Sequence, residues 1–182
     1  MFATAPKGLE HRLLRFENTL RRIGLIFALV LIPALMLTRL VEILTRSLNT
    51  PGSLYNAMES ELFLLFAFLT IATAFASDHH VRVDLFRARM GPRLRAWIEI
   101  LGILFFILPF AGIVFWYGGI LTGIVWSDGE RSALALGAPV RFLIIGAMPL
   151  GIAMFVAVAL SRLARTILFL RGKAADPSGT VT

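Results

Sequence analysis

From Ile100 to Trp126 the chain runs for 27 residues without one ionisable side chain. As an α-helix rising about 1.5 Å per residue, this run is longer than the roughly 30 Å hydrocarbon core of a bilayer. The whole chain agrees with lipid as the solvent, because 58% of its residues are hydrophobic and only 16% are charged. Soluble domains average about 45–50% apolar and about 25% charged residues. The run therefore predicts a transmembrane helix.

Three further apolar runs predict three more spans. Residues 142–160 are free of charge, and so are residues 62–77. Residues 23–37 are uncharged, and the run extends to Leu44 if Arg39 and Glu42 lie at the interface. We predict an all-α integral membrane protein with four spans, at about 23–44, 58–77, 97–126 and 139–161, and a loop over 78–96.

The basic residues predict the orientation of these spans. Fourteen of the 18 Lys and Arg residues lie before the first span, between the second and third, or after the fourth. The remaining four are Arg39, Arg46, Arg131 and Arg141. Because cytoplasmic segments carry the excess of Lys and Arg, both termini and the loop over 78–96 are expected in the cytoplasm. Trp97 and Trp126 bracket the third span, as interfacial tryptophans do.

Two basic segments resemble interfacial helices. In the segment 1–22, which is expected in the cytoplasm, Leu13, Leu14 and Phe16 lie among arginines. This pattern predicts an amphipathic helix that lies on the anionic leaflet. The alternative is a charged flank that only sets the topology of the first span. Between spans two and three, apolar side chains from Phe86 recur every four residues, which predicts a short interfacial helix ending near Met90. Pro92 favours the start of a second helix that runs into the third span. Residues 172–182 form a tail expected to be disordered.

Several classes of function are disfavoured by the residues present. With no Cys and only three His residues, a metal site or a cysteine nucleophile is not expected, and no persuasive set of catalytic residues occurs. Nucleic-acid binding is disfavoured because the arginines lie between membrane spans without interleaved aromatic residues. We therefore expect no enzyme and no cofactor. Small residues at four-residue spacing, Gly119 with Gly123 and Ala147 with Gly151, predict close helix contacts within the chain or with another subunit.

Ordered motifs along the chain resemble one membrane-protein family. Residues 78–86 read Asp-His-His-Val-Arg-Val-Asp-Leu-Phe after the second span, residues 126–132 read Trp-Ser-Asp-Gly-Glu-Arg-Ser, and two proline motifs follow at 138–139 and 148–151. This pattern is similar to the DctQ family, the small membrane subunit of tripartite ATP-independent periplasmic (TRAP) transporters. The residues that carry the resemblance are His80, Arg82, Asp84, Trp126, Glu130, Ser132, Pro139 and Pro149. Glu59 and Glu61 are the candidates for the acid that the family places at the start of the second span.

The resemblance implies a scaffold within a secondary transporter of the bacterial inner membrane. In such a symport system a periplasmic binding protein captures an organic acid, such as a dicarboxylate, and a large membrane subunit of the DctM family moves it with sodium. The small subunit would brace the large one, and the ion sites are expected in the large subunit. Two alternatives stay open, a small membrane scaffold of another complex that does not transport and a channel built by oligomerisation.

The resemblance also suggests roles for single residues, each beside a simpler one. His80 and Asp84 are expected to orient the interfacial helix and bind the large subunit, or only to cap that helix. The candidates for contact with lipid headgroups are Arg82, Arg87, Arg89 and Trp97. The simpler role of the three arginines is to set the topology of the spans. Glu130 and Ser132 would lie where a binding protein docks, or would cap a turn.

Overall fold

A computed structural model describes residues 7–48, 53–77, 91–131 and 141–171 of the chain. The helices are α1 (Lys7–Ser47), α2 (Ser53–Ala76), α4 (Pro92–Gly102), the π-helical segment η1 (Ile103–Ile107), α5 (Leu108–Ser127) and α6 (Arg141–Leu170). Because α4, η1 and α5 form one continuous helix, four helices are long and apolar enough to cross a membrane. The predicted all-α architecture with four candidate spans is confirmed. The interfacial helix expected before Met90 and the tail over 172–182 lie outside the described residues.

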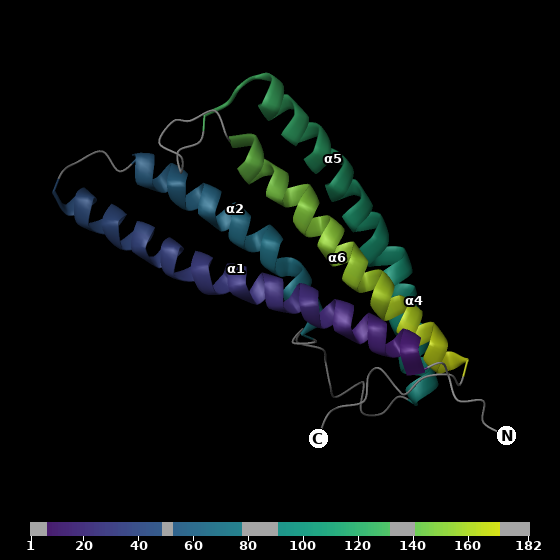
Figure 1. Ribbon diagram of the computed structural model, residues 1–182. Helices are drawn as coiled ribbons and strands as arrows, with labels where there is room; N and C mark the ends of the chain where they lie inside the picture. Colours follow the sequence, from purple (N-terminus) through teal and green to yellow (C-terminus); the bar gives the residue numbers. More distant parts are fainter. Residues whose placement is uncertain (1–6, 49–52, 78–90, 132–140, 172–182) are drawn as a thin grey trace.

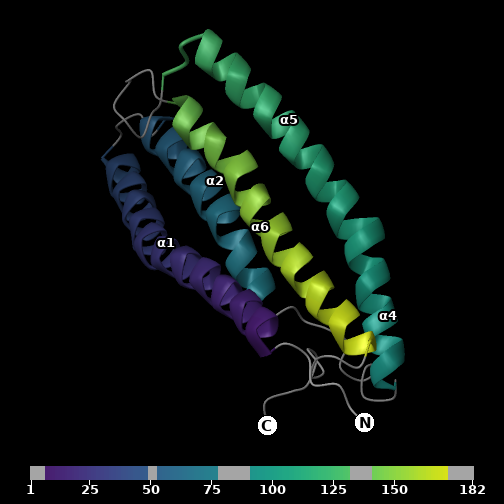
Figure 2. The ribbon, with the colours of Figure 1, turned by 45° about the vertical axis from the view of Figure 1, so that its right-hand side comes forward.

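The four spans lie side by side in one layer, in the order α1, α2, α6, α5 (Figures 1 and 2). Each span packs on its neighbour in that order, and α1 also meets α6 near its first turns. We call the end of the layer where α1 and α4 begin and α2 and α6 end the basal end, and the opposite end the apical end. The first and last described helices thus start and finish at the same end, as an even number of spans requires.

Glycines set the closest contacts between neighbouring spans. A Cβ atom on Gly24 of α1 would lie 1.7 Å from Thr73 Oγ1 of α2, and one on Gly151 of α6 would lie 2.0 Å from the Phe68 carbonyl oxygen of α2. Only a residue without a Cβ allows backbones to approach this closely. Gly151 belongs to the small-residue pair with Ala147, for which the predicted helix contact is therefore internal.

The third span changes its winding just before a proline. Pro92 occupies the first turn of α4, as the sequence predicted. The Leu108 N–H bonds to the Ile103 carbonyl five residues earlier, which is the wider π-helical spacing. Pro109 follows directly and has no N–H to give to the carbonyl four residues before it. The wide turn accommodates the proline without ending the helix.

The first turns of α1 continue directly into the first span. Residues from Lys7 onward belong to the same helix as the first span, without an intervening break. Leu13, Leu14 and Leu20 are half-buried, and Leu20 packs against the main core cluster of the layer. These leucines are partly covered by protein, whereas Phe16 of the same segment is exposed.

Candidate functional site

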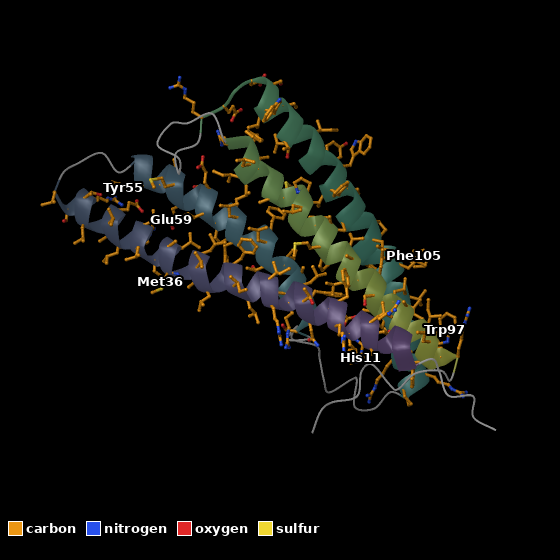
Figure 3. All side chains as sticks on the ribbon, viewed as in Figure 1. His11, Met36, Tyr55, Glu59, Trp97 and Phe105 are labelled. Carbon is orange, nitrogen blue, oxygen red and sulfur yellow. The ribbon has the colours of Figure 1, made fainter. Side chains whose placement is uncertain are left out.

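At the apical end, Arg39 joins α1 to α2. Its Nη1 atom donates hydrogen bonds to Glu42 Oε2 at 2.5 Å and to Glu59 Oε2 of α2 at 2.9 Å. The Arg39 side chain is 55% exposed, so these ion pairs are solvated and weak. Glu59 lies on the side of α2 that faces α1, where Figure 3 labels it near Tyr55.

Arg141 makes the corresponding connection on the other side of α2. Its Nη1 atom donates to Glu130 Oε2 at 2.8 Å, and its Nε atom lies 3.8 Å from Glu61 Oε1. Arg141 is the first residue of α6, so it ties the start of this helix to α2 and to the segment after α5. Glu61, Arg131 and Arg141 also line a hollow of about 370 Å³, together with Ala57, Ser60, Leu64, Ile144 and Ile145. We call Arg39, Glu59, Glu61, Glu130 and Arg141 the apical cluster.

Two other predicted residues, Trp126 and Pro149, make contacts across α5 and α6, and Trp126 stays largely exposed. The Trp126 ring meets the Phe142 ring edge to face, with centroids 4.3 Å apart. Pro149 lies against Gly118 of α5, where a Cβ atom would meet its Cδ at 3.4 Å. Both residues therefore have a packing role within the chain.

At the basal end, Arg162 of α6 is buried between three helices. Its Nε atom donates to Glu99 Oε1 of α4 at 2.6 Å, and its Nη1 donates to the Phe75 carbonyl near the end of α2 at 3.4 Å. The guanidinium also lies 5.5 Å from the centre of the Phe75 ring, a cation–π distance. Only 7% of Arg162 is exposed. By sequence this arginine was counted only among the basic residues after the fourth span, and the structure shows that its side chain is turned inward.

Glu17 joins α1 to α6 through two residues that flank Arg162 in the sequence. Its two carboxylate oxygens accept hydrogen bonds at 2.7 Å from Ser161 Oγ and at 2.7 Å from Arg165 Nη1. We call Glu17, Glu99, Ser161, Arg162 and Arg165 the basal cluster. Side chains of α6 donate each of the four hydrogen bonds named above, and these bonds connect α6 to α1, α2 and α4.

The two clusters differ in burial and leave the middle of the layer apolar. The ion pairs of the basal cluster are largely buried, whereas Arg39 and Arg141 of the apical cluster are exposed. Residues 23–38, 62–77, 100–127 and 142–161 of the four described spans carry no charged side chain. Among the described residues, no three His, Asp or Glu side chains gather as a metal site requires. The arrangement can join helices and present charge at both ends, and it offers no ionisable relay at mid-depth.

The structure brings together only part of the predicted set of residues. Glu59, Glu61 and Glu130 meet in the apical cluster through Arg39 and Arg141, which sequence reasoning had used only to count charges. Trp97 lies apart from them on α4 at the basal end, exposed and labelled in Figure 3. The remaining predicted residues lie outside the described residues: His80, Arg82, Asp84, Arg87, Arg89, Ser132 and Pro139.

A comparison with protein families now bears on these clusters. Residues 35–169 match the family of tripartite ATP-independent periplasmic transporters, DctQ component. The chain belongs to the DctQ family. The match covers every residue of the apical cluster and the basal residues of α4 and α6, but it begins after Glu17. DctQ proteins are transporter components and not an enzyme family. No curated protein and no solved structure matches the chain.

Proposed function

We propose that this DctQ protein is the scaffold that braces the large membrane subunit of a TRAP transporter in the inner membrane. Membership of the family carries the proposal. The helix layer supports it, because its described spans hold no charge at mid-depth on which a coupled transport path could be built. Sodium and the organic acid would pass through the large subunit. Both termini and the basal end would then face the cytoplasm, and the apical cluster the periplasm.

Purification and reconstitution test this proposal. The tagged chain should co-purify with a large polytopic subunit. Uptake of an organic acid into proteoliposomes should require both chains, a periplasmic binding protein and a sodium gradient. Undiminished uptake without this chain would rule out an essential scaffold. Purification alone or with an unrelated complex would instead favour the non-transporting scaffold, and ion conductance by the chain alone would favour an oligomeric channel.

The outer face of α5 is the surface that we propose for contact with the large subunit. The layer has two edge helices, and both expose apolar side chains, as Met36 and Phe105 illustrate in Figure 3. The exposed face of α1 consists mainly of bulky aliphatic residues, as lipid-facing helices often do. On α5, by contrast, Gly112, Gly119 and Gly123 have open space at their Cβ positions. Glycines of this kind allow another transmembrane helix to approach closely.

Added bulk on α5 should therefore break assembly. In the double variant Gly119→Leu/Gly123→Leu, we expect co-purification with the large subunit to fall at least about tenfold, because a lost close helix contact costs more than 1.4 kcal/mol. The melting temperature of the isolated chain should change little. The matched control is Leu29→Trp/Met36→Trp, which adds bulk to the exposed face of α1 and should leave co-purification intact. Equal loss in both variants would contradict the assignment to α5.

Charge at the apical cluster is proposed to guide docking of the binding protein. Glu130→Lys should lower uptake dependent on the binding protein about fivefold or more, while leaving assembly with the large subunit intact, since a reversed surface charge slows an electrostatically steered encounter. The measurement is uptake at several salt concentrations. Because Glu130 also pairs with Arg141, the swap Glu130→Lys/Arg141→Glu serves as a control that can restore this pair. If Glu130→Lys no longer assembles with the large subunit and the swap recovers both assembly and uptake, the role of Glu130 is structural.

A further inference from the structure

The first turns of α1 have two faces of opposite character. Arg12, Arg15 and Arg22 are exposed, and their spacings of three and seven residues place them on one side of the helix. We call these three arginines the basic face. Glu17 and Gly24 lie on the opposite side, which packs against α6 and α2.

The position of Glu17 keeps its negative charge away from the basic face. Glu17 is the acid among residues 11–22, and a carboxylate on the exposed side would offset one of the arginines. Its side chain instead turns inward and is bound by Ser161 and Arg165 of α6. Between the arginines, the exposed side carries the neutral polar residues Asn18 and Thr19, and Phe16 is exposed beside Arg12. The surface is therefore mainly cationic, with the Phe16 ring at its edge.

The basic face also lies at the depth of lipid headgroups. Arg22 directly precedes Ile23, where the long apolar run of α1 begins. Arg12 lies ten residues earlier, about 15 Å along the helix. His11, which Figure 3 labels, marks the basal end of this stretch. Juxtamembrane arginines in this position are attracted to anionic lipid surfaces, and guanidinium groups match phosphate oxygens in geometry.

We propose that the basic face of α1 binds the phosphates of anionic phospholipids in the leaflet at the basal end. The segment stands upright against α6 instead of lying flat in the membrane, and it uses its charged side where an amphipathic surface helix would use its apolar side. Glu17 is a positioning residue that orients this side outward. The proposal concerns the lipid alone and holds whether or not the chain serves a transporter.

Retention of lipid by the purified chain tests the proposal. The chain is reconstituted in nanodiscs of equal parts phosphatidylglycerol and phosphatidylcholine. The protein is then released from the nanodisc, and the lipids that stay bound to it are counted by native mass spectrometry. The wild-type chain should retain phosphatidylglycerol in excess. Arg12→Gln/Arg15→Gln should lower that excess about threefold or more, because each arginine near an anionic surface adds to the attraction. Arg12→Lys/Arg15→Lys should keep most of it.

A matched pair of arginines at the apical end provides the control. Arg46 and Arg131 are exposed, and Arg46→Gln/Arg131→Gln should leave the phosphatidylglycerol excess unchanged. If both glutamine pairs lose the same share of the phosphatidylglycerol excess, net charge alone explains the retention and the proposal is overturned. Loss in the lysine pair as large as in the glutamine pair would assign these arginines to the folding of α1, and would also overturn it. If Arg12→Gln/Arg15→Gln keeps the excess but no longer co-purifies with the large subunit, the face binds an acidic protein surface and the lipid assignment is wrong.

Discussion

Replacing Gly151 by alanine should lower the melting temperature of the detergent-solubilised protein by about 5–10 °C. Overpacking a close contact costs about 1–3 kcal/mol, and in a chain of this length each kcal/mol corresponds to about 2–4 °C. The added Cβ would lie 2.0 Å from the Phe68 carbonyl oxygen and 2.5 Å from its carbonyl carbon. Backbone atoms cannot turn away as a side chain does, so α2 and α6 must separate.

The separation matters because α2 and α6 form the middle of the layer. A cluster that includes Phe75 of α2 and Ile152 and Phe155 of α6 is buried between them, with the Phe75 and Phe155 rings 5.0 Å apart. Moving one helix outward loosens this whole contact, and not only the site of substitution. The expected loss should be seen as an earlier and broader thermal transition, followed by circular dichroism.

Gly119→Ala is the matched control for this substitution. It adds the same methyl group to a helical glycine of α5, where no atom lies within 4 Å of the new Cβ. Alanine is favoured over glycine inside a helix by about 1 kcal/mol, so this variant should melt at the same temperature as the wild-type chain or slightly above it. Equal destabilisation by both substitutions would mean that the contact with Phe68 does not set the effect.

The two glycine positions also show where sequence reasoning stopped. Gly119 with Gly123 and Ala147 with Gly151 have the same four-residue spacing, and both pairs predict a helix contact. The structure places Gly151 against Phe68 and leaves Gly119 and Gly123 on the outer face of α5. Spacing reveals which residues share a face, but it does not reveal which face meets a neighbour. That depends on the order of helices in the layer, which no local pattern encodes.

The apical acids show the same limit at the level of single side chains. The sequence offered Glu59 and Glu61 as alternatives for one role. Residues two apart in a helix point to opposite sides, so the structure gives each its own partner, Arg39 on α1 and Arg141 on α6. The apolar runs sufficed to predict four spans, because length and the absence of charge are local properties. The pairs that join the spans are separated by up to 148 residues in the chain.

Arg162 shows that a count of charges does not reveal which side chains are buried. By position it belongs to the basic segment after the fourth apolar run, where it was counted only as one positive charge. However, α6 continues to Leu170, and Arg162 is turned inward against Glu99 and Phe75. The signal that could have found it is Glu99, an acid at the start of the third apolar run that needs a positive partner at the same depth.

Removing Glu99 is expected to destabilise the protein more than any other loss of a single ion pair in the described structure. Glu99→Ala leaves the Arg162 guanidinium buried without the carboxylate that now lies 2.6 Å from its Nε atom. Breaking a buried pair on one side costs about 3–5 kcal/mol, because the remaining charge has lost its compensation. The free energy of unfolding, measured by denaturant titration in mixed micelles, should fall by that order.

The exposed pair at the other end of the layer is the control for Glu99→Ala. Glu59→Ala removes an acid that also binds an arginine across two helices, but Arg39 is 55% exposed and solvent can replace the partner. Exposed pairs contribute about 0–1 kcal/mol, so Glu59→Ala should change the free energy of unfolding by no more than that. The contrast between the two variants isolates burial from the mere presence of an ion pair.

A double variant distinguishes loss of a charge partner from loss of packing. In Glu99→Leu/Arg162→Met both charges disappear and side chains of comparable reach fill the space between α4, α2 and α6. Since an apolar pair of similar volume often replaces a buried ion pair at no cost, the double variant should recover most of the stability lost in Glu99→Ala. If the double variant unfolds as easily as Glu99→Ala, the hydrogen bond and ring contact of Arg162 with Phe75 hold the basal end together, and the carboxylate of Glu99 is secondary.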